Sequence, residues 1–165
     1  MKNSLKEKIK FFTRILGTEP DTEYMNRVYT QFTLIEFKNG QKTYVFDGAF
    51  EGHMLCTADM IGKTKEIVLV MLVLSLERVA SEGKSIVPSS KHGDNYFGPI
   101  LSVNGCIEEI IIQDDPKNAK RWQDAIVDFG VGKILIEIDK KYFHLQLKEG
   151  DYIHIIGRVD LRGIE

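Results

Sequence analysis

The chain has 165 residues, of which 43% are hydrophobic and 28% charged, and this balance excludes a disordered protein. Its 22 Lys and Arg residues against 24 Asp and Glu residues give a net charge of -2. The chain as a whole therefore lacks the basic excess that is typical of proteins that bind nucleic acid through its phosphates. The two cysteines, Cys56 and Cys106, have neither a CxxC nor a zinc-ligand spacing and are expected to be free thiols.

Two features predict a cytoplasmic protein that does not cross a membrane. Residues 1–10 are polar and charged, where a secretory signal would be apolar. The most apolar run, Ile67 to Leu76, is about half the ~20 residues that a membrane-spanning helix needs.

Residues 1–19 are predicted to form an N-terminal amphipathic helix. Asn3 or Ser4 can cap its start, while Gly17 and Pro20 are placed to end it. Its apolar positions recur at helical spacing: Leu5, Ile9, Phe12, Ile15 and Leu16. The rest of its surface is basic, with Lys2, Lys6, Lys8, Lys10 and Arg14. Such a helix either packs its apolar stripe on the body or docks an acidic partner, a nucleic acid or a membrane surface.

Residues 20–82 are predicted to form a small antiparallel β unit. Residues alternate with period two from Arg27, and Asn39-Gly40 predicts a type I′ hairpin turn before a returning strand at 43–46. A further short strand is expected around His53 to Cys56, between glycine-containing turns. Residues 66–79 fit either a buried strand, which the β-branched residues of the first half favour, or a buried helix.

Residues 83–97, with Gly, Ser, Pro and charge, are expected to link this unit to a C-terminal unit at 98–165. The C-terminal unit begins with an apolar strand over 100–112, in which Gly105 allows a sharp bend. Two strands follow within 124–139, around a turn at Gly130 and Gly132, and a last strand spans 152–161. In the last strand four residues are expected to face inward: Ile153, Ile155, Val159 and Leu161.

The C-terminal unit resembles an OB-fold of the kind found in single-stranded-DNA-binding proteins such as replication protein A. The resemblance rests on the run from Asp128 to Gly132 and on the segment from Glu149 to Val159. It implies that the first forms the hairpin between the second and third strands, and that the second forms the fourth strand. An OB barrel needs a fifth strand, which the N-terminal half or a second copy would supply, unless the barrel stays open. A faint similarity of Asp47-Gly48 and Gly52 to Asp128, Gly130 and Gly132 is compatible with tandem barrels.

Outward-facing aromatic and basic residues of this unit form the candidate nucleic-acid-binding surface, because aromatic rings stack on bases and cations pair with phosphates. The candidates are Phe129, Lys133, Lys141, Tyr142, Tyr152, His154 and Arg158. The alternative is that Phe129 and Phe143 plug the barrel and that the lysines are solvated. Acidic residues outnumber basic residues from Pro88 onward, which weighs against a phosphate-binding surface.

Enzyme chemistry finds little support, since the chain has no G-x-S-x-G, Walker, HExxH or dinucleotide-binding motif. His53 with Cys56, His92 with Asp94, and Asp114 with Asp115 are isolated pairs, too few for a metal or catalytic site. The expected fold is mainly β, with an N-terminal helix, a small antiparallel β unit and a C-terminal OB-like barrel. The expected function is a binding module without catalysis, cofactor, metal or membrane contact, with single-stranded DNA or RNA as first candidate. The alternative is a protein-interaction or assembly subunit, either a homo-oligomer or part of a complex, that makes no nucleic-acid contact.

Overall fold

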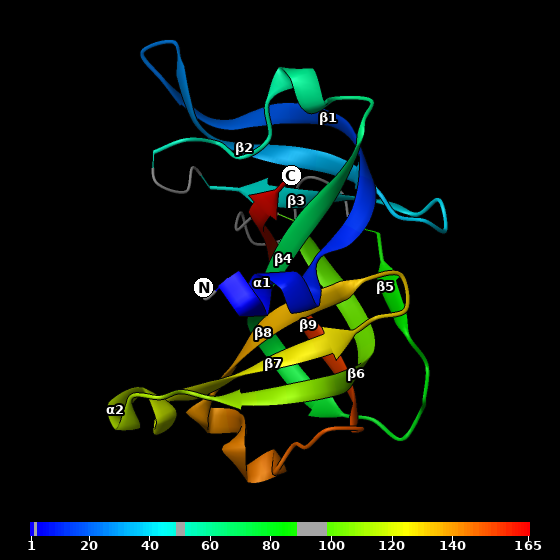
Figure 1. Cartoon of the computed structure of the whole chain (residues 1–165), viewed down its shortest axis with the longest axis vertical. Coiled ribbons are helices and arrows are strands. Elements are labelled where there is room, and N and C mark those ends of the chain that lie inside the picture. Colours follow the sequence, from blue (N-terminus) through cyan, green and yellow to red (C-terminus); the bar gives the residue numbers. More distant parts are fainter. Residues whose placement is uncertain (2, 49–51, 89–98) are drawn as a thin grey trace.

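The computed structural model describes residues 1, 3–48, 52–88 and 99–165. Their strands form a single continuous sheet, with short helical segments at its margins (Figure 1). The strands are β1 (Phe11–Tyr24), β2 (Arg27–Glu36), β3 (Lys42–Asp47), β4 (Thr64–Arg78), β5 (Ser85–Val87), β6 (Ile100–Ile112), β7 (Trp122–Asp128), β8 (Lys133–Asp139) and β9 (Tyr152–Ile164). The helical segments are α1 (Asn3–Ile9), η1 (Ala58–Met60), α2 (Pro116–Ala119) and η2 (Lys140–Leu145).

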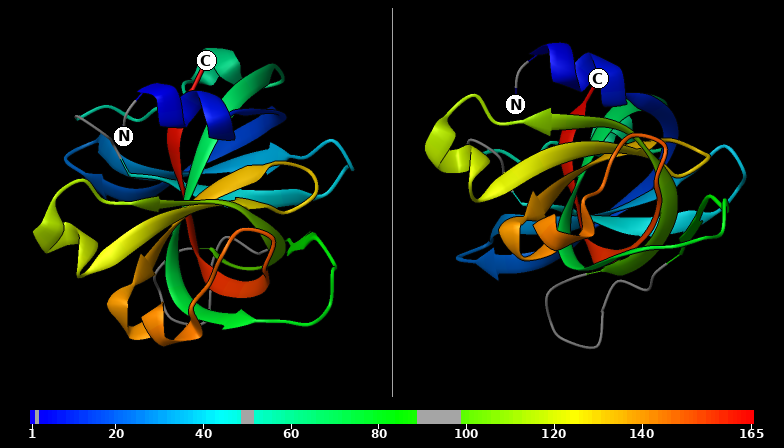
Figure 2. Two further views of the ribbon diagram at one scale, coloured as in Figure 1. Left: turned by 60° about the horizontal axis from the view of Figure 1, so that its bottom comes forward. Right: turned by 90° about the horizontal axis from the view of Figure 1, so that it is seen from below.

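The sheet closes on itself twice and so makes two five-stranded barrels. The first barrel runs β1-β2-β3-β9-β4 and returns to β1, while the second runs β6-β7-β8-β4-β9 and returns to β6. In each barrel one pair is parallel: β3 with β9 at Phe46 and Asp160, and β8 with β4 at Leu135 and Val70. This is the strand order of an OB-fold, in which the third strand pairs in parallel with the fifth. The two barrels are the upper and lower halves of Figure 1, and Figure 2 shows the strands curling around each other.

The long strands β4 and β9 belong to both barrels. The start of β4 pairs with β1, and its middle pairs with β8 as the fifth strand of the second barrel. The start of β9 pairs with β6, and Asp160 pairs with β3 as part of the fifth strand of the first barrel. The N-terminal half thus supplies the strand that the C-terminal OB-like barrel lacked, and residues 66–78 are part of the strand β4. The predicted units at 20–82 and 98–165 are each closed by a strand from the other.

The two shared strands lie very close where they cross. Gly157 is opposite Val73, next to a bulge in β4. A Cβ atom at Gly157 would be 2.1 Å from the backbone oxygen of Leu72 and 3.1 Å from the Cγ of Met71. Only glycine fits this crossing without moving the backbone.

The N-terminal helix is present but shorter than the sequence predicts. It ends at Ile9, and the residues expected to continue it form β1. In β1, Thr13 and Ile15 are buried while Phe12 and Arg14 are exposed, so the period there is two. Pairing with β2 and β4 on either side outweighs the helical spacing of a few apolar residues. Gly17 lies at a register shift of β1 and not at a helix end.

Two local predictions in the first barrel are wrong. Residues 53–56 form no continuous strand: His53 makes an isolated β-bridge, and the backbone N–H groups of Leu55 and Cys56 donate to the buried carboxylate of Asp47. The β2–β3 hairpin exists, but only Gly40 in its turn has a positive φ, so the turn is not type I′. The tight turn with two positive φ angles joins β1 to β2 at Met25 and Asn26, which carry no glycine signal.

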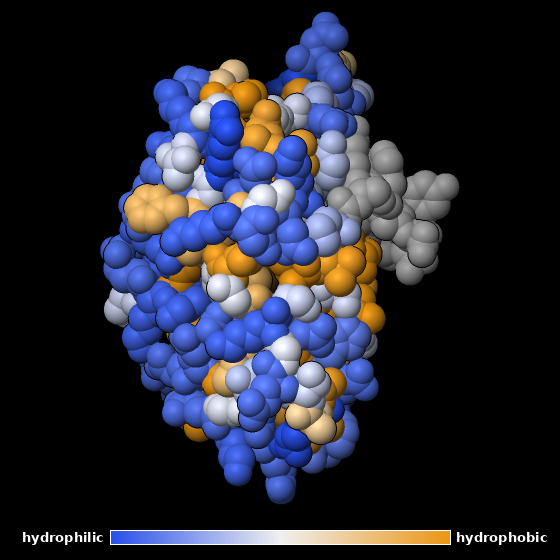
Figure 3. Space-filling model, turned by 90° about the vertical axis from the view of Figure 1, so that its right-hand side faces the viewer, coloured by the Kyte–Doolittle hydropathy of each residue, from blue (hydrophilic) through white to orange (hydrophobic). Residues whose placement is uncertain are grey.

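One hydrophobic core extends through both barrels, from Ile15 and Val45 in the first to Ile136 and Ile155 in the second. The predicted inward residues of β9 are all buried. Polar side chains dominate both ends of the surface in Figure 3, and apolar ones gather in a band between them.

The β7–β8 turn at 129–132 is the counterpart of the β2–β3 turn at 37–41. The tandem barrels are real, whereas the similarity of Asp47-Gly48 to Asp128 and Gly130 is accidental, because Asp47 ends β3.

Candidate ligand-binding site

A cavity of about 480 Å³ lies between α1 and the outer surface of the second barrel. It is lined by Met1, Leu5, Lys6, Val70, Asp124, Leu135, Glu137 and Arg162. Three of these residues are on β7 and β8, the second and third strands of that barrel. OB-folds commonly bind their ligands on the face of these strands, and cavities of 300–1,000 Å³ suit small molecules.

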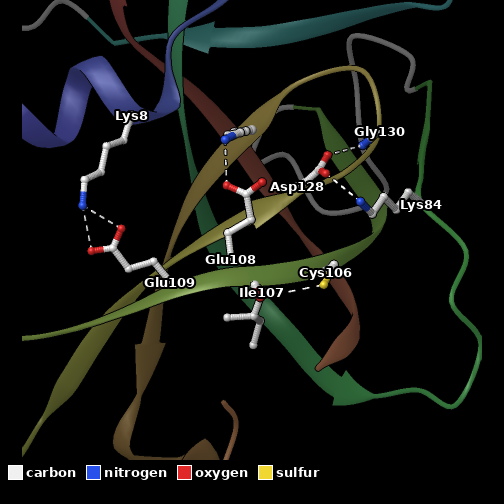
Figure 4. A network of polar contacts seen from close by, with 9 residues as sticks. Lys8, Lys84, Cys106, Ile107, Glu108, Glu109, Asp128 and Gly130 are labelled. Carbon is white, nitrogen blue, oxygen red and sulfur yellow. Dashed lines mark hydrogen bonds and ion pairs between the residues drawn. The ribbon is translucent and has the colours of Figure 1, made fainter. Parts of the chain in front are cut away.

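α1 covers the cavity because its apolar residues need a surface on which to pack. Ile9 is fully buried against Val68, Ile126 and Leu135, outside both barrels, and Leu5 packs beside it. The helix lies across the junction of the barrels (Figure 1). Its polar side is held by an ion pair from Lys8 to Glu109 on β6, at 2.7 Å (Figure 4).

The residue after α1 fixes the chain at a second point. The Lys10 ammonium pairs with Glu7 at 2.7 Å and with Glu165 at 2.9 Å, so it ties the helix to the C-terminal residue. These hydrogen bonds raise the pKa of Lys10 and lower the pKa of Glu165. The basic helix therefore packs on the body, and several of its charges pair within the chain.

One wall of the cavity is acidic. Asp124 on β7 and Glu137 on β8 are directly opposite each other, so two like charges share one edge of the cavity. Burial raises the pKa of Asp124, although the Gln113 amide donates to it at 2.8 Å and the Met1 amino group is nearby. Partial burial, together with the carboxylates of Asp124 and Asp139, raises the pKa of Glu137. The carboxylates at this wall are thus incompletely compensated by the protein itself.

The remaining walls are apolar and basic. Val70 on β4 and Leu135 on β8 form the floor, where these two strands run parallel. Arg162, on β9, lines the other side and pairs with Asp160 at 3.5 Å. Lys6, on α1, is close enough to Glu165 to lower the pKa of that carboxyl group. The cavity thus combines an acidic wall, an apolar floor and a basic wall.

The seven residues predicted to bind nucleic acid do not form one surface. Phe129 is only 1% exposed and packs edge-on against Phe11 and Phe37, with ring centroids 5.9 and 5.7 Å away. Its ring therefore plugs the core, as the alternative interpretation held, and offers no face to a base. Lys133 pairs with Glu108 at 2.7 Å. Lys141 and Tyr142 lie in η2, where the Tyr142 hydroxyl donates to the Leu74 carbonyl oxygen.

Tyr152, His154 and Arg158 do lie along one side of β9, as the alternation predicts. The Arg158 guanidinium, however, makes two hydrogen bonds to the Asp160 carboxylate, at 2.7 and 2.9 Å, and lies over the Phe46 ring. These contacts use two of the five N–H donors of Arg158, and the Phe46 ring covers one face of its guanidinium.

His154 lies in a polar chain that crosses three strands. Its Nε2 is 2.7 Å from the Ser102 hydroxyl on β6, and its Nδ1 is 3.2 Å from the Glu77 carboxylate on β4. The order serine, histidine, carboxylate is that of a hydrolase triad. Ser102 lies inside a strand that pairs with β5 and β9, so the neighbouring backbone N–H groups serve the sheet and not an oxyanion.

The isolated pairs that the structure describes do not gather into a larger cluster of metal-ligand residues. No group of three or more His, Cys, Asp or Glu residues among the described positions has the geometry to hold a metal ion. Cys56 is buried, which raises its thiol pKa, and His53 borders a separate hollow beside the β1–β2 hairpin. Asp115 caps α2 by accepting from the N–H of Lys117. His92 and Asp94 lie outside the described residues.

Sequence reasoning missed the acidic wall. Asp124 and Glu137 were visible as charged residues of a predicted hairpin, but nothing local indicates that α1 covers them.

None of the described helices has the length and apolar character needed to span a membrane.

No protein-family model and no curated protein matches this sequence. A solved structure of ModG, a cytoplasmic molybdate-binding protein with molybdate bound, aligns over 93% of this chain and 94% of its own. The sequences are 14% identical and the TM-score is 0.43. A likeness this remote does not bear on what this chain binds.

Proposed function

We propose that this protein is a binding module for a small organic molecule, which it holds between α1 and the β7–β8 face of the second barrel. The observation that carries the proposal is the 480 Å³ cavity, with apolar residues at its floor and ionisable residues on two sides. Binding sites typically combine an apolar lining with a few polar groups that orient the ligand. The raised pKa values of Asp124 and Glu137 support it, because displaced ionisation often marks functional sites.

A blocked cavity tests the proposal. Fragments that bind the protein are first found by ligand-observed NMR. The binding of each fragment to wild type is then compared with its binding to Val70→Trp, a variant that places an indole in the cavity floor. The matched control is Leu72→Trp, two residues along the same strand, where the side chain is already 48% exposed and lines no part of the cavity. Binding should be lost only in Val70→Trp. If this variant does not fold, Leu5→Trp blocks the cavity from the helix side. Fragments that bind all variants equally would refute the site.

Single-stranded nucleic acid remains a weaker candidate. The OB strand order of both barrels favours it. The acidic wall on the β7–β8 face and the internal pairing of Lys133 and Arg158 weigh against it. Titration of labelled single-stranded oligonucleotides at low salt tests it directly, and no binding at micromolar protein would end this candidate.

The assembly alternative is favoured by one specific feature, the β1–β2 hairpin that extends from the upper barrel (Figure 1). Its tip exposes Tyr24 and Met25, the latter by 81%, and Tyr29 lies nearby at 42%. Exposed tyrosine and methionine side chains are enriched in protein interfaces. Light scattering tests this candidate: a strict monomer whose state is unchanged by Met25→Ser would count against self-assembly.

A further inference from the structure

The charged residues of the cavity are sorted by strand. Across the sheet the order is β9-β4-β8-β7. The basic residue Arg162 is on β9, the apolar Val70 and Leu135 are on β4 and β8, and the acidic pair is on β8 and β7. Strands are spaced by about 4.8 Å, so the axes of β9 and β8, with β4 between them, are separated by roughly 10 Å. The cavity is therefore polar at both ends and apolar in the middle.

The acidic end of the cavity favours a positively charged ligand group. Glu137 and Asp124 face each other directly, and Asp139 adds to the repulsion that Glu137 experiences. Among the described residues, the positively charged groups of Met1, Lys6 and Arg162 belong to the cavity lining, and the Met1 amino group lowers the pKa of Asp124. Burial still raises the pKa of Asp124 despite the amino group, so a further positive charge beside this carboxylate would stabilise its ionised form.

The basic end of the cavity favours a negatively charged ligand group. Lys6 on α1 and Arg162 on β9 approach this end from two different elements, and both act on acidic groups near the C-terminus. Arg162 contacts the Asp160 carboxylate at 3.5 Å and brings the positive charge of its guanidinium to this end of the cavity. Lys6 contributes a long flexible side chain that can follow a ligand.

We propose that the ligand of this cavity is a zwitterion, whose ammonium group faces Asp124 and Glu137 and whose carboxylate faces Lys6 and Arg162, with a short aliphatic spacer over Val70 and Leu135. This inference rests on the proposed function and names the ligand class for the same site. ω-Amino acids and short apolar peptides belong to that class. A simple amine or a simple fatty acid would satisfy one end only and leave the other charged wall exposed to the cavity.

Three probes of matched length separate the contributions: 6-aminohexanoate, hexylamine and hexanoate, measured by isothermal titration calorimetry at neutral pH. The zwitterion should bind at least about tenfold more tightly than either singly charged probe, since a charge-assisted hydrogen bond in a partly buried site is worth that factor or more. Glu137→Gln should weaken the zwitterion and hexylamine, and Lys6→Gln should weaken the zwitterion and hexanoate.

The controls change exposed residues of the same types outside the cavity. Glu82→Gln removes an exposed carboxylate, and Lys120→Gln removes an exposed lysine. Both should leave binding of 6-aminohexanoate within about twofold of wild type.

The outcomes separate this inference from the proposed function. In one outcome, hexanoate or hexylamine binds as tightly as 6-aminohexanoate, Glu137→Gln has no effect, and Val70→Trp abolishes binding. This result would overturn the zwitterion as ligand class but would support the cavity as a ligand site. Binding that survives Val70→Trp would refute the cavity itself. The absence of measurable binding for all three probes at millimolar concentration would overturn the zwitterion, while fragment binding lost in Val70→Trp would still support the cavity.

Discussion

The most direct test of the strand-sharing architecture is the substitution Gly157→Ala. The new methyl group would be 2.1 Å from the backbone oxygen of Leu72, far inside van der Waals contact, and a backbone atom in the middle of a sheet cannot turn aside. Adding a methyl group to a well-packed core costs about 1–3 kcal/mol, and the rigid neighbour puts this site at about 3 kcal/mol. For a protein of this size each kcal/mol lowers Tm by about 2–4 °C, so the expected fall is roughly 6–12 °C.

Both barrels should lose stability together, because Gly157 is on β9 opposite β4 and each barrel needs both strands. The single tryptophan, Trp122 on β7, reports the second barrel by fluorescence, while circular dichroism reports the whole sheet. The two melting curves should coincide in wild type and in the variant. The control is Gly17→Ala, where an added Cβ atom meets nothing within 4 Å and stability should change by less than about 1 kcal/mol. A Tm that is unchanged in Gly157→Ala, or a shift seen by only one probe, would refute this reasoning.

Three further predictions concern side chains. Phe129→Ala removes a buried ring that contacts Phe11 and Phe37, and should lower the free energy of unfolding by about 3–5 kcal/mol in urea denaturation; a loss below 1 kcal/mol would mean that the ring is not a plug. Asp47→Ala leaves the N–H groups of Leu55 and Cys56 and the Gln31 amide without their acceptor, and should cost about 3 kcal/mol, whereas the exposed Glu82→Ala should cost less than about 0.5 kcal/mol. The third prediction is a pH dependence of stability. The folded state raises the pKa of Glu137 above its ordinary 4.5, so protonation of this carboxyl group favours folding. This stabilisation is fully present below pH 4.5 and is lost as the pH rises through the pKa of Glu137 in the folded protein. Glu137→Gln should therefore weaken the dependence of the free energy of unfolding on pH above pH 4.5, measured by urea denaturation. An unchanged dependence would contradict a raised pKa of Glu137.

Much of the second barrel could be predicted from local sequence. The alternation of Ile134, Ile136 and Ile138 and of the β9 residues gives both the strands and their inner faces, since one face of each strand must be apolar to build the core. The Gly130 and Gly132 turn was also recognisable, because Gly130 has a φ of 98°, which other residues rarely adopt.

The exchange of strands could not be predicted in the same way. β4 and β9 carry apolar residues along their whole length, and this pattern is the same whether a strand serves one barrel or two. The partner of each half of these strands is decided by contacts between residues far apart in sequence. For the same reason the cavity escaped prediction: it arises where Met1, Leu5 and Lys6 meet β4, β7, β8 and β9, and no short segment contains it.

The N-terminal region shows a local signal that tertiary pairing overrides. Phe12, Ile15 and Leu16 fit a helix by spacing, yet Phe11 to Tyr24 is a strand with partners on both sides near its start. Phe11 in particular packs against Phe37 and Phe129, so this segment joins the cores of both barrels. A few residues of helical periodicity cannot outweigh so many long-range contacts.

The exchange of β4 and β9 also sets the order in which the chain can fold during its synthesis. The first barrel cannot close until Asp160 of β9 reaches β3, so the N-terminal half stays incomplete until residue 160 has been synthesised. At 5–20 residues per second the second half of the chain takes roughly 4–17 s to emerge. Throughout that interval the edge of β3 and the far part of β4 lack their neighbours, and they are exposed to pairing with other nascent chains.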